Sequence, residues 1–224
     1  SAGSGKTFSV IERIARLVKD GVPARSILAT TFTKKAAQEM MERLETKGVN
    51  TREMSVRTMH SYCWSLIRSH RLFAGFEIDD KDAARIILKK IVGFSGMKWK
   101  QCDITLVEKF IADCRNALVT PENSRSFKIH DYDERYSEAY FRFSTDMYSR
   151  KLITFDDMLY YGVMLLKEDN RLLENEQGKY EYVIVDEYQD SNVAQVELAE
   201  MIARPEMNLM VVGDVDQCHP AGTL

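Results

Sequence analysis

The sequence has 224 residues, of which 45% are hydrophobic and 29% are charged, a balance that indicates an ordinary packed core. No run of about 18 apolar residues occurs, which argues against a membrane span, and the opening residues form a glycine-rich motif instead of a signal peptide. The first residue is not Met, so we expect the natural protein to begin earlier. Cys63, Cys102, Cys114 and Cys218 follow no CxxC spacing, which predicts reduced thiols in a cytoplasmic protein and no zinc site.

The formal net charge of −3 argues, on average, against a nucleic-acid partner. The charge is unevenly distributed, however. Residues 25–71 carry nine Lys or Arg against four Asp or Glu, whereas residues 174–216 carry two against eleven. The average therefore conceals a basic segment, although a run of charge is usually no more than a solvated face.

Hydrophobic periodicity predicts alternating helices and strands in the first third of the chain. Apolar residues recur at helical spacing in residues 6–19, and the short, β-branched run 27–32 predicts a buried strand. Thr33 can cap the next helix, which we expect to end at Gly48. Residues 54–57 predict another short strand, followed by a helix.

The middle of the chain, residues 76–150, has a helical pattern with polar breaks at 93–96 and 120–126. Its last helix carries a stripe of three aromatic residues and one Met, which indicates a core face instead of a binding platform. The residues of this stripe are Tyr136, Tyr140, Phe143 and Met147.

The final third returns to an alternating pattern. Residues 155–167 predict an amphipathic helix, and the apolar runs 182–185 and 209–212 each lead directly into carboxylates. Such runs are typical of central parallel strands with chemistry at their C-terminal ends. The order predicts an α/β fold in which a helical subdomain interrupts a parallel sheet.

The opening residues fill seven of the eight positions of the phosphate-binding pattern G-x-x-x-x-G-K-[ST]. Backbone N–H groups of such a loop wrap the phosphates, and the following helix points its positive end at them. We expect Lys6 to reach the β- and γ-phosphates and the Thr7 hydroxyl to ligate Mg²⁺. A glycine-rich turn without a ligand is the alternative. The nucleotide-binding residues are Ser1, Ala2, Gly3, Ser4, Gly5, Lys6 and Thr7.

Two carboxylates, Asp186 and Glu187, follow the apolar run 182–185. Hydrolysis of a nucleotide needs a metal near the β- and γ-oxygens and a group that orients the attacking water. Asp186 fits the first role, and Glu187 fits that of general base. Either residue alone is compatible with helix capping, but together with the phosphate loop they indicate an ATPase. Gln217 can sense a γ-phosphate, or it can simply form a turn.

These segments resemble, in order, the motifs of superfamily 1 DNA helicases of the UvrD/Rep/PcrA type. They correspond to motifs I, Ia and Ib, the F-D-D-L-L signature, and motifs II and III. The matching segments are SAGSGKT, ILATTFTKKAAQEMMERL, TMHSYCWSLIR, LITFDDML, VIVDEYQDSN and VVGDVDQ.

The resemblance implies a RecA-like P-loop NTPase domain (1A) from residues 1–75 and 151–224, with a helical 1B subdomain at 76–150. It implies ATP and Mg²⁺ as cofactors, and movement in the 3′–5′ direction on single-stranded DNA or at single-strand–duplex junctions. Lys6, Asp186, Glu187 and Gln217 would serve catalysis, Gln217 as the γ-phosphate sensor, and Gln189 would couple the nucleotide site to domain movement. The implied DNA-track residues are Thr31, Phe32, Thr33, Thr58 and His60.

Individual track residues have alternative interpretations. Phe32 ends a buried strand and can be a core residue, while His60 can cap a helix. As DNA contacts, hydroxyls and an imidazole would hold phosphates, and Phe32 or Trp64 would stack on bases without reading their edges, although Trp64 can also be a core residue.

The sequence departs from the family pattern after Gln217, where residues 218–224 (CHPAGTL) contain neither the expected stacking aromatic nor the phosphate-binding arginine. We also expect the strand before the phosphate loop and the second RecA-like domain, with its arginines, to lie outside this sequence. The chain alone would then be nearly inactive as an ATPase. The alternatives are a nucleotide-dependent DNA-binding switch or scaffold and a subunit of a helicase–nuclease.

Overall fold

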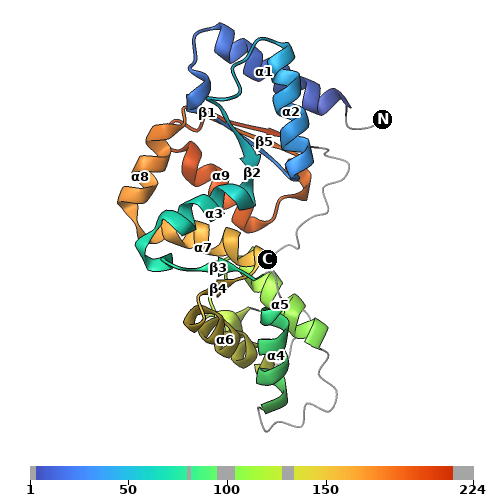
Figure 1. Cartoon of the computed structure of the whole chain (residues 1–224), viewed down its shortest axis with the longest axis vertical. Helices are drawn as coiled ribbons and strands as arrows, with labels where there is room; N and C mark the ends of the chain where they lie inside the picture. The colour runs from blue at the N-terminus through green and yellow to red at the C-terminus, as the bar shows by residue number, and fades with distance from the viewer. Residues whose placement is uncertain (1–3, 80–81, 95–103, 128–133, 214–224) are drawn as a thin grey trace. The chain divides into compact units, whose positions relative to one another are not determined.

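The computed structural model describes residues 4–79, 82–94, 104–127 and 134–213 (Figure 1). The chain divides into two compact units. One unit joins the chain up to Tyr62 with the chain from Leu165 onward and contains the main sheet. The other unit, Cys63–Met164, is mostly helical.

The main sheet has four parallel strands in the order β2 (Ser55–Thr58), β1 (Ile27–Thr31), β5 (Tyr182–Asp186) and β6 (Leu209–Val212). This confirms the predicted parallel α/β fold and its strands. All five residues of β1 are buried, because helices cover both faces of the sheet and leave no solvated side for polar residues. β6 lies at the edge of the described sheet, so it is not central as expected, and its residue Val211 is 43% exposed.

One face of the sheet is covered by α1 (Ser4–Lys19) and α2 (Lys34–Thr46), and α9 (Val193–Ala203) packs against β5 and β6 (Figure 1). The apolar stripe of α1 contacts the sheet through residues such as Val10 and Ile14, which are fully buried. The predicted cap is present, because the Thr33 hydroxyl accepts the Ala36 N–H at 3.0 Å.

The α/β unit also contains α8 (Asn170–Lys179), which the periodicity did not predict because the segment is short and polar. This helix has no long apolar stripe, and hydrogen bonds to residues distant in the sequence hold it in place. The Tyr62 hydroxyl, from α3 (Met59–Ser69), donates to the buried Glu176 carboxylate at 2.6 Å. The Gln177 side chain donates to the Met201 carbonyl at 2.7 Å.

The helical unit is built from α4 (Ala83–Phe94), α5 (Ile104–Asn116), α6 (Glu134–Ser149) and most of α7 (Phe155–Glu168). The break expected at 120–126 contains a 3-10 turn at Ser124–Ser126. The stripe of α6 is buried in the core of this unit, which confirms the prediction. Its members are Tyr136, Tyr140, Phe143 and Met147.

The helical unit extends beyond residues 76–150 on both sides and contains a two-stranded parallel sheet. The sheet pairs β3 (Glu77–Ile78) with β4 (Leu152–Ile153), strands too short to predict from a pattern. Aromatic rings from the segment before β3 and from α7 pack together. The ring centroids of Phe73 and Phe76 lie 4.9 Å apart, and those of Phe73 and Tyr161 lie 5.1 Å apart. Residues 63–75 and 151–164 belong to the same compact unit as the helices.

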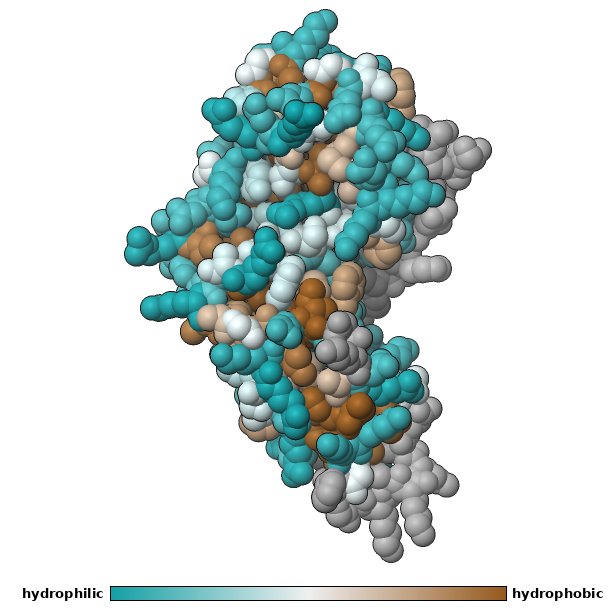
Figure 2. Space-filling view, viewed as in Figure 1, coloured by the Kyte–Doolittle hydropathy of each residue, from teal (hydrophilic) through white to brown (hydrophobic). Residues whose placement is uncertain are grey.

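The surface differs between the two units. In Figure 2 the visible face of the α/β unit is mainly hydrophilic, whereas hydrophobic atoms gather over α4 and α5, where Ile86 and Leu106 are half-exposed. None of the described helices is both long and apolar enough to cross a membrane.

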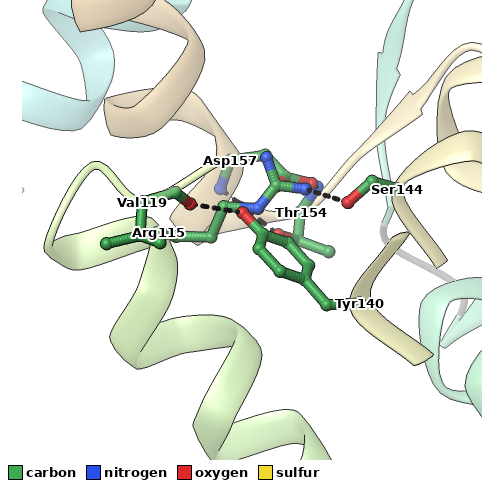
Figure 3. A network of polar contacts seen from close by, with 6 residues as sticks. All are labelled: Arg115, Val119, Tyr140, Ser144, Thr154 and Asp157. Atoms are coloured by element: carbon green, nitrogen blue, oxygen red, sulfur yellow. Dashed lines mark hydrogen bonds and ion pairs between the residues drawn. The ribbon is translucent and has the colours of Figure 1, made fainter. Parts of the chain in front are cut away.

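A buried ion pair joins three helices of the helical unit (Figure 3). The Arg115 guanidinium of α5 lies 2.9 Å from the Asp157 carboxylate of α7, and both side chains are almost fully buried. Arg115 also donates to the Ser144 hydroxyl of α6 at 3.2 Å. The rings of Tyr160 and Tyr161 lie 4.5 and 5.0 Å from its guanidinium carbon.

Asp157 has a second role at the start of α7. Its carboxylate accepts the Thr154 N–H at 2.7 Å, and the Thr154 hydroxyl accepts the Asp157 N–H at 3.3 Å, which forms a reciprocal helix cap. Among the described residues, Nε and Nη1 of Arg115 have no hydrogen-bond acceptor. The tyrosine faces around the guanidinium offset part of that cost through cation–π attraction.

We predict that Asp157→Ala destabilises the helical unit by about 3–5 kcal/mol, because it leaves a buried guanidinium without its counter-charge. Asp146→Ala is the matched control, since Asp146 pairs with Arg150 at 2.9 Å on an exposed face of α6. That change should cost about 0.5 kcal/mol or less. Hydrogen exchange of the α5, α6 and α7 amides measures the loss of stability in both variants. Equal losses in Asp157→Ala and Asp146→Ala would show that the buried ion pair does not stabilise the helical unit.

Candidate functional site

The candidate site lies at the C-terminal edge of the main sheet. All four strands run in the same direction, so the segments that follow them meet at this edge. The register places the strand ends side by side: Thr31 is opposite Thr58, and Asp186 is opposite Val212. The β5–β6 half carries the expected nucleotide residues, and the β1–β2 half carries the expected DNA residues.

The nucleotide half brings the phosphate-loop helix to the end of β5. The Thr7 hydroxyl, near the N-terminus of α1, donates to the Asp186 carboxylate across 3.5 Å. Asp186 is 6% exposed. Ser4, Gly5 and Lys6 form the first turn of α1, whose N-terminal end attracts anions. Ser1, Ala2 and Gly3 lie outside the described residues.

Glu187 follows Asp186 with an unusual backbone conformation. Its φ of 58° and ψ of 43° are left-handed, which costs a residue other than glycine about 1–2 kcal/mol. Its N–H donates to the Asp186 carboxylate at 3.1 Å. The chain therefore reverses direction immediately after the strand and presents two adjacent carboxylates at the sheet edge.

Gln189 lies against the second of these carboxylates. Its side-chain amide donates to Oε2 of Glu187 at 2.5 Å and to Oδ2 of Asp190 at 3.3 Å. Gly213, at the end of β6, packs against Gln189 from the other side. Sequence reasoning missed Gly213, for which the signal was a glycine directly after an apolar strand. Gln217 lies outside the described residues.

The donor set at this edge suits Mg²⁺. The ion usually takes one or two protein oxygens and completes its coordination with phosphate oxygens and water. Thr7 and Asp186 offer a hydroxyl and a buried carboxylate on the same side of the sheet edge. Among the described residues, no cluster of three or more His, Cys, Asp or Glu could hold a metal by itself.

The DNA half of the edge contains two buried threonines. Thr31 and Thr58 are 5% and 7% exposed. The Thr31 hydroxyl donates to the Thr33 carbonyl at 2.9 Å, and the Thr58 hydroxyl accepts the Ser61 N–H at 3.1 Å. These hydroxyls therefore shape the loops after β1 and β2 in this conformation.

Phe32 is the most prominent exposed side chain of this half. It is 57% exposed, so the interpretation of Phe32 as a core residue does not hold. Thr33, Lys34 and Lys35 are also exposed and follow it into α2. The edge thus presents an aromatic ring beside two cationic side chains.

His60 lies in the first turn of α3 and is partly buried. Burial lowers the pKa of its imidazole from 6.5 to about 4. The imidazole is therefore neutral at pH 7, so it can donate or accept a hydrogen bond but contributes no positive charge.

Comparison with known proteins agrees with this arrangement. The model of the family described as UvrD/REP helicase N-terminal domain matches residues 1–218. The chain is 33% identical over 224 residues to the ATP-dependent DNA helicase PcrA of Leuconostoc citreum and 34% identical over 222 residues to that of Bacillus subtilis. Each match covers 96% of this chain but 30% of the relative. The motif order, the parallel sheet and these matches show that the chain belongs to the UvrD/REP helicase N-terminal domain family.

Proposed function

We propose that this chain is the ATP-binding front part of a DNA helicase that couples ATP hydrolysis to 3′–5′ movement on single-stranded DNA. The Thr7–Asp186 contact carries the proposal, because it joins two motifs 179 residues apart in the sequence. Without that contact, a glycine-rich turn and a pair of carboxylates would be two unrelated features. Family membership supports the same assignment.

Each residue of the nucleotide half has a chemical role in this proposal. Lys6 balances charge on the β- and γ-phosphates, while Thr7 and Asp186 hold Mg²⁺. Glu187 orients a water molecule and accepts its proton as the water oxygen bonds to the γ-phosphorus and the bond from that phosphorus to the bridging oxygen of the leaving ADP breaks. Backbone N–H groups of Ser1 to Thr7 cradle the phosphates. Gln217 senses the γ-phosphate, and Gln189 links the site to domain movement.

The β1–β2 half is the proposed single-strand track. Phe32 stacks on a base, and Thr33 contacts the backbone beside it. Thr31 and Thr58 hold the track at the ends of adjacent strands, and His60 holds it from the first turn of α3. Stacking and backbone contacts suit a motor that must step along any sequence, because neither depends on base identity.

The remaining parts of the proposal concern the whole protein. On the family resemblance we assign residues 1–75 and 151–224 to a RecA-like domain 1A and residues 76–150 to subdomain 1B, whereas the division into compact units groups 63–75 and 151–164 with the helices. Because the chain spans 30% of its relatives, a second RecA-like domain would supply the arginines that complete the ATP site. We further propose single-strand–duplex junctions as substrates and a cytoplasmic location. Strand separation by the full-length protein distinguishes a motor from a nucleotide-dependent switch.

Glu187→Gln in the full-length protein should reduce ATP hydrolysis in the presence of single-stranded DNA by roughly 10²–10⁴. Loss of the proton acceptor slows chemistry, whereas binding of ATP should remain. Glu181→Gln is the matched control, since Glu181 is exposed just before the opposite end of β5. A Glu187→Gln enzyme as active as the Glu181→Gln enzyme would exclude Glu187 as the base.

Phe32→Ala should weaken binding of single-stranded DNA by about 1–3 kcal/mol, the usual contribution of one base–aromatic stack. Phe141→Ala is the matched control, because it removes another exposed phenylalanine, 46% exposed on α6, that lies outside the proposed track. Fluorescence anisotropy with a labelled oligonucleotide measures both affinities. If the two variants bind the oligonucleotide with equal affinity, Phe32 does not contact single-stranded DNA.

The lowered pKa of His60 also predicts a pH effect on stability. Between pH 6.5 and about 4 the folded chain binds fewer protons at this site than the unfolded chain, so stability falls as the pH decreases. From pH 7 to pH 5 the loss due to His60 should stay below about 2 kcal/mol, because solvent screens this partly exposed imidazole. His60→Gln should lose less stability over this interval than the wild type in urea titrations. An equal loss in both proteins would contradict the burial of a neutral imidazole.

A further inference from the structure

Gly213 leaves no room for a side chain at the end of β6. A Cβ atom built there would lie 2.7 Å from Oε1 of Gln189 and 2.9 Å from its backbone nitrogen. Contacts under 3.0 Å essentially do not occur for real Cβ atoms. Rotation of the Gln189 side chain would relieve only the first contact, because the second involves backbone.

The opposite end of the same amide group contacts the carboxylates. Nε2 of Gln189 donates to Glu187 and to Asp190. An amide has a donor end and an acceptor end, and only the NH₂ group can face a carboxylate favourably. Oε1 must therefore face Gly213, where the missing side chain leaves the space for it.

The backbone of Glu187 is hydrogen-bonded to Asp186 and Asp190, but these bonds leave its carboxylate free to rotate about the side-chain bonds. Glu187 is partly exposed, and its left-handed conformation lies between a strand and a short 3-10 turn, Tyr188–Asp190. A general base must hold its carboxylate within hydrogen-bonding reach of the attacking water. A displacement of about 1 Å can reduce a rate by about 10².

We propose that Gly213 and Gln189 are positioning residues that fix the carboxylate of Glu187. The end of β6 supports the Gln189 amide, and the amide holds Glu187. This rests on the proposed function, in which Glu187 is the general base. Through Gln189, the end of the strand that precedes Gln217, the proposed γ-phosphate sensor, is thus connected to the hydrolytic residue after the neighbouring strand.

Gly213→Ala in the full-length protein tests the proposal. The Cβ atom should displace Gln189 and lower kcat of DNA-stimulated ATP hydrolysis by about tenfold or more, consistent with a misplaced base. The affinity for a non-hydrolysable ATP analogue should change by less than about twofold, because phosphate and metal contacts lie elsewhere. A parallel loss of analogue affinity would show general damage to the site and overturn the positioning role.

Gly178→Ala is the matched control. Gly178 lies in α8, where a Cβ atom would meet nothing within 4 Å and the backbone is not left-handed. This variant should keep the wild-type kcat. If Gly213→Ala hydrolyses ATP as fast as Gly178→Ala, while Glu187→Gln is inactive, the positioning role is excluded and the proposed function stands. If the wild type shows no DNA-stimulated hydrolysis, the proposed function itself fails.

Gln189→Leu provides a second measurement that does not depend on how well Gly213→Ala folds. Leucine approximates the volume of glutamine but has no N–H donor, so kcat should fall with analogue affinity retained. In the double variant, the losses should not multiply, because both changes disrupt one contact chain. Independent, multiplying losses, or an unchanged kcat in Gln189→Leu, would overturn the proposal.

Discussion

The approach of the Thr7 hydroxyl to the Asp186 carboxylate is the contact on which the rest of the site depends. Parallel pairing makes it possible, because β5 lies between β1 and β6 and ends at the same edge as both. The apolar residues of β5 are buried under helices on both faces, so the sheet fixes its end rigidly. α1 packs on this sheet through Val10 and Ile14, and thereby places the phosphate loop beside the carboxylates.

The same edge serves both proposed ligands. Thr31 and Thr58 end adjacent strands on the DNA side, and Thr30 pairs in register with Val185 next to the nucleotide side. The segment after β5, which carries Glu187, and the segment after β1, which carries Phe32, therefore follow neighbouring strands. A movement of one can be transmitted to the other across a single pair of strands. Close spacing of the two halves on one rigid sheet is the physical basis that we propose for coupling hydrolysis to movement.

Local patterns predicted much of this fold, including α1, the buried β1, the Thr33 cap and the buried stripe of α6. These features were predictable because each is determined by residues close together in the sequence. α8 could not be predicted in this way, since its support comes from Tyr62 and Met201 far along the chain. The same holds for the Arg115–Asp157 pair and for the fit of Gly213 against Gln189, which only the folded chain brings together.

We propose that the nucleotide half and the DNA half of one sheet edge are coupled, so that DNA binding changes the rate of ATP hydrolysis. The most direct test is the rate of ATP hydrolysis by the full-length protein with and without single-stranded DNA. If the two halves are coupled, the rate should rise many-fold when DNA is added and saturate as the track fills. A rate that stays the same at saturating DNA would contradict this coupling.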